Sequence, residues 1–213
     1  MNFNKQVEAE HYNFTNYLSR KKWNSIYYQI DEINKLNPDS ILEIGVGTGI
    51  LKLIMKNYFN FNYESIDIDE KLNPNHIGSV LELPFSDNKY DVICCFQVLE
   101  HIPYEYFQTA LSEIFRVAKK SVLISLPDTG KVLKFHIPKF FKMKLYPLPF
   151  LTIKKKHVFD GEHYWEINKK GYEIKEIINK MTEISNRNNF ILDKEYQIWE
   201  FPYHHFFCFH TDK

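Results

Sequence analysis

The chain has 213 residues, 44% of them hydrophobic and 25% charged, which are the proportions of an ordinary globular protein and suit a single domain over residues 1–213. The formal net charge is zero, which argues against a nucleic acid as partner. There is no apolar run of the roughly 18 residues that span a membrane, no signal-peptide core at the start and no metal or redox spacing among the three cysteines. We therefore expect a protein of the reducing cytoplasm with buried free thiols.

The predicted elements alternate between helix and strand. Residues 5–36 form a predicted helix, because apolar side chains recur at helical spacing around Ile26, Ile30 and Ile33. Apolar runs then predict a strand over 40–46, a helix over 49–59, strands over 62–69 and 90–98, a helix over 106–118 and a strand over 121–127. A helix over 172–184 and two strands, over 190–201 and 203–210, complete the predicted elements.

This alternation predicts an α/β fold with a doubly wound, mostly parallel sheet, in which the last two strands form an antiparallel pair. We divide the single domain into an N-terminal helical cap (1–37), a ligand-binding core (38–127), a basic and aromatic lid (128–170) and a C-terminal helix with the strand pair (171–213). Ligands of such sheets bind at the carboxyl ends of the strands.

The sequence ILEIGVGTGIL, residues 41–51, places Gly45, Gly47 and Gly49 between a strand and a helix. Bare backbone at such a turn lets a ligand approach the N–H groups closely. The dinucleotide fingerprint G-x-G-x-x-G requires a glycine at position 50, where Ile50 stands, and this disfavours a nicotinamide-dependent oxidoreductase.

The pattern that is present, E-x-G-x-G-x-G, resembles the first motif of the class I S-adenosylmethionine-dependent methyltransferases. The resemblance implies a Rossmann-like seven-stranded sheet, S-adenosylmethionine as cofactor and S-adenosylhomocysteine as product. It assigns Gly45, Gly47 and Gly49 to the methionine portion of the cofactor and Glu43 to its cationic amino group.

An acidic residue at the end of the second strand is expected to accept both ribose hydroxyls, because a carboxylate offers two acceptors to two donors. Asp67 occupies that position, with Asp69 as the alternative, and Ile68 would lie against the adenine.

Residues 78–102, GSVLELPFSDNKYDVICCFQVLEHI, are similar to the central part of the small-molecule members of this class. Ser79 stands where these members usually carry an aspartate facing the adenine amino group, and a hydroxyl can still accept that hydrogen bond. The resemblance implies that Val80 and Leu81 flank the adenine and that Phe96 and Gln97 lie beside the methyl donor.

Glu100 and His101 follow at once, either to fix the turn beneath the acceptor or to act on it directly. Gln97 removes one hard oxygen anion from any metal set that these residues could form, so no metal is expected.

Residues 131–157 contain eight lysines and no acidic residue, interleaved with aromatic, leucine and proline residues. The segment follows the fifth predicted strand, where such folds often insert a lid. It suggests an anionic acceptor, such as a phosphorylated or nucleotide-linked small molecule, or peripheral contact with an anionic membrane. The alternative is a solvated loop with lysines outward and aromatics packed inward.

Four histidines and one tyrosine complete the candidate residues. His163, in the cluster EHYW, is the first candidate for a general base, and His101 is the second. His204 and His205 lie on alternate faces of a strand, so only one can point inward, and packing is the expected role of both. Tyr12 is expected to fold over the cofactor.

The sequence therefore predicts a methyltransferase that moves a methyl group from S-adenosylmethionine to a small, anionic or sugar-like acceptor at oxygen. Two other functions stay open: an NAD(P)-dependent oxidoreductase on a related sheet, and a cofactor-binding partner protein without catalysis. The sequence makes no prediction of the oligomeric state.

Overall fold

The structure, a computed structural model, describes residues 6–13, 15, 17–137, 141–145, 154–159 and 161–211. In this part of the chain the main sheet has seven strands in the order β3-β2-β1-β4-β5-β9-β8, of which β9 is antiparallel to both neighbours and all other pairs are parallel. The strands are β1 (Ser40–Ile44), β2 (Asn62–Asp67), β3 (His76–Ile77), β4 (Tyr90–Phe96), β5 (Ala118–Pro127), β8 (Phe190–Gln197) and β9 (His204–Thr211). The predicted doubly wound sheet and its antiparallel C-terminal pair are confirmed.

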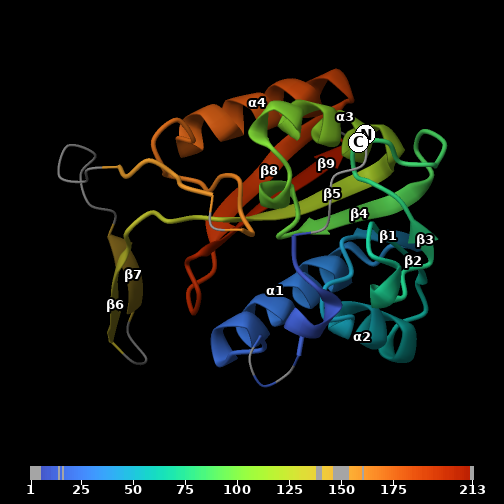
Figure 1. Cartoon of the computed structure of the whole chain (residues 1–213), viewed down its shortest axis with the longest axis horizontal. Coiled ribbons are helices and arrows are strands. Elements are labelled where there is room, and N and C mark those ends of the chain that lie inside the picture. Colours follow the sequence, from blue (N-terminus) through green and yellow to red (C-terminus); the bar gives the residue numbers. More distant parts are fainter. Residues whose placement is uncertain are drawn as a thin grey trace.

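Helices cover both faces of this sheet (Figure 1). They are α1 (Arg20–Leu36), α2 (Ile50–Tyr58), α3 (Phe107–Val117) and α4 (Ile174–Arg187). The first two lie on one face and the last two on the other, so three layers result. Short 3₁₀ turns, η1 (Ala9–His11), η2 (Glu70–Leu72), η3 (Leu99–His101) and η4 (Tyr104–Tyr106), join these elements.

The central strands are apolar on both faces because each face packs against helices. Successive residues of β4 enter different hydrophobic clusters: Ile93 packs in the cluster beneath α3 and α4, whereas Val92 and Cys94 pack in the one beneath α1 and α2. All three cysteines are free and buried, as the sequence predicts.

The arrangement of strands places several segments at one edge of the sheet. The parallel strands β1, β2, β4 and β5 all end at this edge. Because β9 runs antiparallel to β5, its first residue, His204, pairs with Pro127 at the end of β5 and lies at the same edge. The C-terminal strand pair therefore adds its own side chains to the place where a ligand is expected.

The N-terminal cap differs from the helix predicted over 5–36. The helix α1 begins only at Arg20, and Ser19 is its N-cap, with a side-chain oxygen that accepts a hydrogen bond from the Lys22 N–H. The apolar spacing that predicted the helix starts within α1. The described residues before Ser19 instead pass the carboxyl ends of the strands, where several of them line a cavity. The prediction was wrong there.

The predicted lid, residues 128–170, contains a hairpin of β6 (Leu133–Ile137) and β7 (Phe141–Leu145), a separate two-stranded sheet that projects from the body (Figure 1). Residues 138–140, 146–153 and 160 lie outside the described part. Further along, the buried Trp165 donates its indole N–H to the carbonyls of Leu99 and Ile102 at 3.1 Å each. This anchor holds the loop around residues 162–167 against η3, the turn that follows β4.

Candidate functional site

The glycine loop after β1 is left-handed at every second residue. Gly45, Gly47 and Gly49 have φ values of 82°, 50° and 70°, a region that residues with a side chain rarely adopt. A Cβ on Gly45 would come within 2.4 Å of Val98, and one on Gly47 would touch the ring of Tyr12 at 3.7 Å. Gly49 has open space around it and is the N-cap of α2. The loop therefore exposes bare backbone to a cavity.

That cavity, the cofactor hollow, has a volume of about 210 Å³ and lies at the carboxyl ends of β1, β2 and β4. Most of the residues that the sequence assigns to the cofactor line it: Glu43, Gly45, Gly47, Asp67, Ile68, Ser79, Val80, Phe96, Gln97 and Tyr12. Gly49 and Leu81 do not, and Leu81 packs against the main hydrophobic cluster. Its N–H donates to Ser79 Oγ at 3.2 Å, which leaves the serine one further lone pair.

Asp67 joins the end of β2 to the glycine loop. Its Oδ2 accepts the N–H of Val46 at 2.7 Å, and its Oδ1 accepts the N–H of Asp69 at 2.9 Å. Each oxygen keeps a second lone pair for a ligand. The alternative, Asp69, also lines the hollow, but it is buried and accepts the Lys71 N–H at the start of η2.

Glu43 is buried beneath the loop. The hydroxyl of Tyr63 donates a hydrogen bond to its carboxylate, and burial raises the pKa of Glu43 to about 8. A positive charge placed above this carboxylate would therefore stabilise its ionised form.

The N-terminal segment covers the hollow. Tyr12 lies against Gly47, and its ring meets that of Tyr17 edge to face at 5.1 Å. Lys22 lies over the Tyr17 ring, with Nζ 3.1 Å from its centroid. Tyr17, Lys22 and Ser25 also line the hollow but were not assigned from the sequence, because only the packing of α1 and of the chain just before it brings them there.

A second cavity, the acceptor hollow, adjoins the first and has a volume of about 280 Å³. The two share Tyr12, Tyr17, Lys22, Gln97, His101 and His204 in their walls. The acceptor hollow adds Glu100, Glu162, His163, Phe201 and Tyr203. His163, the first candidate for a general base, thus lies here, and His101 faces both spaces.

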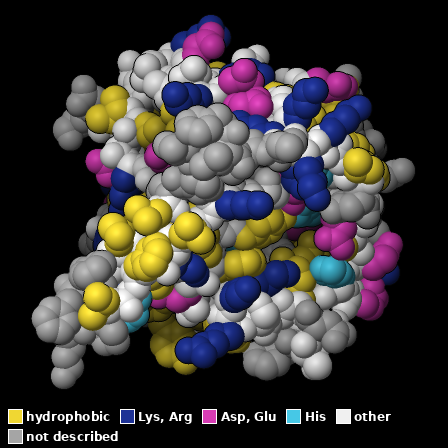
Figure 2. All heavy atoms as spheres, turned by 90° about the vertical axis from the view of Figure 1, so that its left-hand side faces the viewer, with side chains coloured by type: hydrophobic (Ala, Val, Ile, Leu, Met, Phe, Trp, Pro, Cys, Tyr) yellow, Lys and Arg dark blue, Asp and Glu magenta, His cyan; other side chains and the backbone are white. Residues whose placement is uncertain are grey.

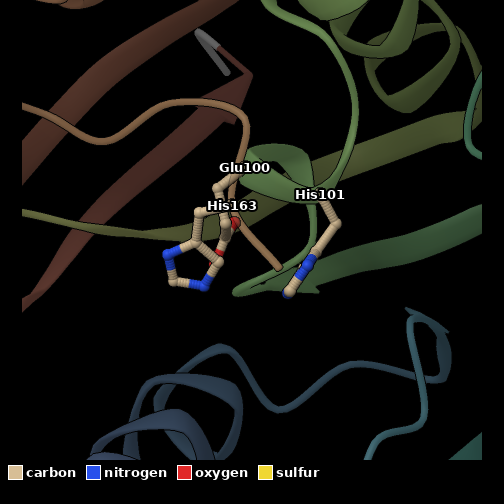
Figure 3. Close-up of side chains that lie close together, drawn as sticks. All are labelled: Glu100, His101 and His163. Carbon is tan, nitrogen blue, oxygen red and sulfur yellow. The ribbon is translucent and has the colours of Figure 1, made fainter. Parts of the chain in front are cut away.

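Three side chains of the acceptor hollow form a cluster (Figure 3): Glu100 and His101 from η3, and His163 from the loop that Trp165 anchors. Their ligand atoms lie within 4.8 Å of one another. Glu100 is fully buried, burial raises its pKa to about 7, and neither carboxylate oxygen has a hydrogen-bond partner among the described residues. Such a set can bind a cation or handle a proton.

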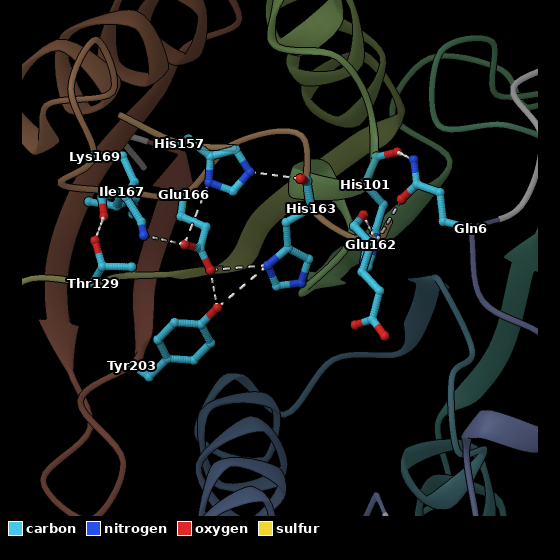
Figure 4. A network of polar contacts seen from close by, with 10 residues as sticks. All are labelled: Gln6, His101, Thr129, His157, Glu162, His163, Glu166, Ile167, Lys169 and Tyr203. Atoms are coloured by element: carbon cyan, nitrogen blue, oxygen red, sulfur yellow. Dashed lines mark hydrogen bonds and ion pairs between the residues drawn. The ribbon is translucent and has the colours of Figure 1, made fainter. Parts of the chain in front are cut away.

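The two imidazoles are held through Nδ1 (Figure 4). The Nδ1 of His101 is 2.9 Å from the carbonyl oxygen of Glu162 and 3.0 Å from Gln6 Oε1. The Nδ1 of His163 is 3.2 Å from the carboxylate of Glu166. Because carbonyl and carboxylate oxygens only accept, Nδ1 is the donor in these contacts and carries a proton in both rings.

Glu166 is itself fixed by several donors. The hydroxyl of Tyr203 donates to it, and Lys169 Nζ lies 3.4 Å from its other oxygen (Figure 4). Although burial opposes ionisation, hydrogen bonds from His163 and Tyr203 and the nearby positive charge lower the pKa of Glu166 to about 2. The carboxylate that orients His163 therefore stays negative over the physiological range.

The two neighbouring histidines of β9 do face opposite ways. His204 lines both hollows, pairs through Nδ1 with Ser25 Oγ at 2.7 Å, and burial lowers its pKa to about 3. His205 packs on the other side, 2.9 Å from Asp128 Oδ2. The strand alternation indicated that one would point inward, but only the sheet shows which.

The basic segment lies elsewhere. None of its described residues, within 131–137, 141–145 and 154–157, lines either hollow. Among the described residues no helix has both the length and the apolar character needed to cross a membrane.

Comparison with known proteins finds a match in the part of the chain that carries the glycine loop. Residues 42–126 match the model of a family described as a methyltransferase domain. The uncharacterized protein MJ0638 of Methanocaldococcus jannaschii is 32% identical over 115 residues, which are 51% of this chain and 49% of that protein. The chain thus spans about half the length of this curated relative.

Solved structures extend the likeness to nearly the whole chain. The PH0226 protein of Pyrococcus horikoshii OT3 superposes with a TM-score of 0.60 at 13% identity, covering 97% of this chain and 100% of that one. Magnesium protoporphyrin IX methyltransferase of Synechocystis PCC 6803, solved with bound SAH, gives 0.55 at 13% identity over 90% of this chain and 83% of that one. At these identities the likeness establishes the fold. Residues 42–126 therefore match a methyltransferase domain, and the chain has the fold of the class I S-adenosylmethionine-dependent methyltransferases.

Proposed function

We propose that the protein transfers the methyl group of S-adenosylmethionine to an oxygen atom of a small, anionic or sugar-like acceptor. The observation that supports this is the junction of two hollows at Gln97 and His101, one carrying the glycine loop and the other the His101–His163–Glu100 cluster. A donor bound in the first would direct its methyl group toward an acceptor in the second.

The cofactor hollow suits the parts of the donor in turn. The ribose hydroxyls would bind the free lone pairs of Asp67, and the adenine would lie by Ile68, Ser79 and Val80. The methionine portion would lie over the glycine loop, and its ammonium group would face Glu43. Leu81 stays a predicted contact, although its side chain does not line the hollow.

The acceptor hollow carries the chemistry that a hydroxyl requires. The sulfonium already activates the methyl group, so alignment and exclusion of water contribute most, up to roughly 7–11 kcal/mol of barrier lowering. A hydroxyl must also lose its proton, and His101 and His163, which line this space, are the candidates to accept it. Lys22, in the same walls, supplies a donor to a polar or anionic acceptor.

Ligand-induced thermal shifts test the cofactor assignment. S-adenosylhomocysteine should raise the Tm of the wild-type protein and NADH should not, because only a ligand that binds the folded state stabilises it. Asp67→Ala should lose most of the shift, since it removes both the ribose acceptor and the hydrogen bond that holds the Val46 N–H. Asp69→Asn is the matched control and should keep the shift. If Asp69→Asn alone loses the Tm increase, Asp69 rather than Asp67 binds the ribose. A Tm increase with NADH would favour the NAD(P)-dependent oxidoreductase.

The pH dependence of stability tests Glu43. Its ordinary pKa of 4.5 applies to the unfolded chain and the raised value of about 8 to the fold, so between these values the folded state holds a proton that the unfolded state has lost. Stability therefore falls as pH rises through this window. Glu43→Gln removes the effect, and its Tm relative to wild type should rise from about pH 5 to about pH 8.5.

Glu64→Gln, on the neighbouring strand, is the control for Glu43→Gln. Burial alone would raise the pKa of Glu64, but hydrogen bonds from His76 and Tyr90 lower it below its ordinary value. Glu64 therefore has the opposite pH effect: its contribution to stability is lost as pH falls. Glu43→Gln should also weaken binding of S-adenosylmethionine, whose ammonium loses its counter-charge. Parallel Tm curves for wild type and Glu43→Gln would show that Glu43 ionises normally and would contradict the assignment.

Turnover tests the acceptor side. With methyl-labelled S-adenosylmethionine and a small-molecule extract of the source cells, the wild-type protein should transfer label to an acceptor. His163→Ala should reduce this by about 10²–10⁴-fold and leave the S-adenosylhomocysteine shift unchanged. His76→Ala, on β3, lines neither hollow and should behave as wild type. Full activity in His163→Ala would remove it from the reaction, and no transfer by the wild type would favour a non-catalytic binding protein.

A further inference from the structure

We propose that Glu100, His101 and His163 bind a divalent cation in the wall of the acceptor hollow. The sequence pointed away from a metal because Gln97 removes one hard oxygen anion from the set that Glu100 and His101 could form. The fold brings in His163 as a third ligand, and the ligand atoms of the three residues then lie within 4.8 Å of one another (Figure 3). The site deepens the function proposed above, because a cation there would face the acceptor.

The hydrogen bonds behind the cluster match those of metal-binding histidines. A ligating imidazole usually donates its second N–H to a carbonyl or carboxylate, which fixes the tautomer and aims the other nitrogen at the metal. His101 meets the carbonyl of Glu162 at 2.9 Å, and His163 meets the carboxylate of Glu166 at 3.2 Å. Glu166 is in turn held by Tyr203 and Lys169 (Figure 4). Both imidazoles are thus held in the manner of metal-binding histidines.

Glu100 distinguishes a cation site from a simple proton acceptor. A histidine base requires one orienting carboxylate, and Glu166 already serves His163. Glu100 is an additional carboxylate, fully buried, whose two oxygens have no hydrogen-bond partner among the described residues. Buried carboxylates are normally hydrogen-bonded, paired or bound to a metal. A divalent cation satisfies this one.

The donor set also indicates the class of cation. Two imidazoles and one carboxylate suit Zn²⁺, Mn²⁺ or Fe²⁺, whereas Mg²⁺ prefers oxygen ligands throughout. All three ligands line the hollow, so positions remain open for water or for an acceptor oxygen. Gln97, in the same wall, donates its amide N–H to Ser125 Oγ at 3.1 Å and keeps its carbonyl oxygen as an acceptor. A cation here would bind the acceptor hydroxyl and ease the loss of its proton.

Calorimetric titration of the chelator-treated protein with Mn²⁺ and with Zn²⁺, without donor or acceptor, tests the site. The wild type should bind one equivalent and show a higher Tm. Both Glu100→Gln and His163→Ala should weaken binding by at least about tenfold. His11→Ala is the matched control, because it lies in the same hollow outside the cluster, and it should bind as wild type.

Circular dichroism confirms that each variant is folded, and His163→Ala carries the test if Glu100→Gln is not. No binding by the wild type, or equal binding by both folded variants, would overturn the proposal. Label transfer by a cation-free wild type would overturn the catalytic role of the cation while leaving the proposed methyl transfer intact.

A second inference concerns the β6–β7 hairpin and rests on a separate observation. The hairpin is amphipathic, but its apolar face points outward. The cross-strand pairs Leu133–Leu145 and Phe135–Met143 alternate with Lys134–Lys144 and His136–Lys142. Neighbouring residues of a strand point to opposite faces, so the apolar pairs share one face and the basic pairs the other. The four apolar side chains are 42–59% exposed.

The basic face explains why the apolar face is outside. Lys134 Nζ donates to the Trp199 carbonyl at 3.0 Å, and Lys144 donates to the carbonyl of Gln197. The ammonium groups of Lys134 and Lys142 also lie 5.9 and 5.8 Å from the centre of the Trp199 ring. The lysines thus hold the hairpin against the loop before β9, and the apolar pairs face solvent.

We infer that this apolar face docks on an anionic lipid bilayer. Contiguous exposed apolar side chains mark interaction surfaces, and segment 131–157 combines them with eight lysines and no acidic residue. Figure 2 shows this side of the molecule, where hydrophobic side chains gather beside lysines. Apolar insertion with surrounding positive charge is the pattern of peripheral binding to anionic lipids.

Co-sedimentation with vesicles tests the docking face. The wild-type protein should bind vesicles of mixed phosphatidylglycerol and phosphatidylcholine, and bind phosphatidylcholine alone weakly. The double variant Phe135→Ser, Met143→Ser should lose at least about tenfold in partitioning. Ile191→Ser, which alters an apolar residue of β8 that is 47% exposed, should bind as wild type.

Equal partitioning of the double variant would overturn this inference. So would self-association of the wild type that the double variant abolishes, measured by analytical ultracentrifugation, because the face would then be an interface between copies. Neither outcome bears on the cofactor hollow, to which the hairpin contributes no described residue.

Discussion

The hydrogen bond from the Val46 N–H to Asp67 Oδ2, 2.7 Å long, is the interaction on which the cofactor side depends. It joins the loop after β1 to the end of β2, while the other oxygen of Asp67 holds the turn that leads into η2. One carboxylate thus positions the bare backbone and the candidate ribose acceptor together. Because the loop is left-handed at three glycines, such a constraint is needed to keep it in one conformation.

The buried carboxylates show how differently the two edges of the sheet are arranged. Asp91, near the start of β4, is buried but accepts the Asp39 N–H and pairs with Lys120 at 2.9 Å. At the opposite edge, Glu43 is held by one tyrosine and Glu100 by no described hydrogen-bond partner. Uncompensated buried charge lowers stability. Glu43 and Glu100 lie where a cationic cofactor group and a metal ion are proposed to bind. Either ligand would offset the free-energy cost of burying the carboxyl group next to it.

The two hollows are built in different ways. The cofactor hollow rests mainly on three strand ends and the turns that follow them, which are regular consequences of a parallel sheet. The acceptor hollow draws on the N-terminal segment, η3, the 162–166 loop and the start of β9. Trp165 links two of these by its hydrogen bonds to Leu99 and Ile102. Helix, loop and C-terminal strand pair therefore meet at one polar space.

What the sequence determined by itself was local. Strands, helices and the glycine loop follow from periodicity and from the conformations that single residues allow, so the sheet, its antiparallel pair and the family resemblance could be predicted from residues close together along the chain. The helix predicted over 5–36 was too long at its start, because nothing in the spacing shows that Ser19 caps α1.

Only the tertiary structure decided which distant side chains meet. It brought His163 to Glu100 and His101, turned His204 toward the hollows and His205 toward Asp128, and laid Tyr17 and Lys22 over the hollows. It also turned the apolar face of the hairpin to solvent. These outcomes depend on packing between segments far apart in sequence, for which a single chain carries no local signal.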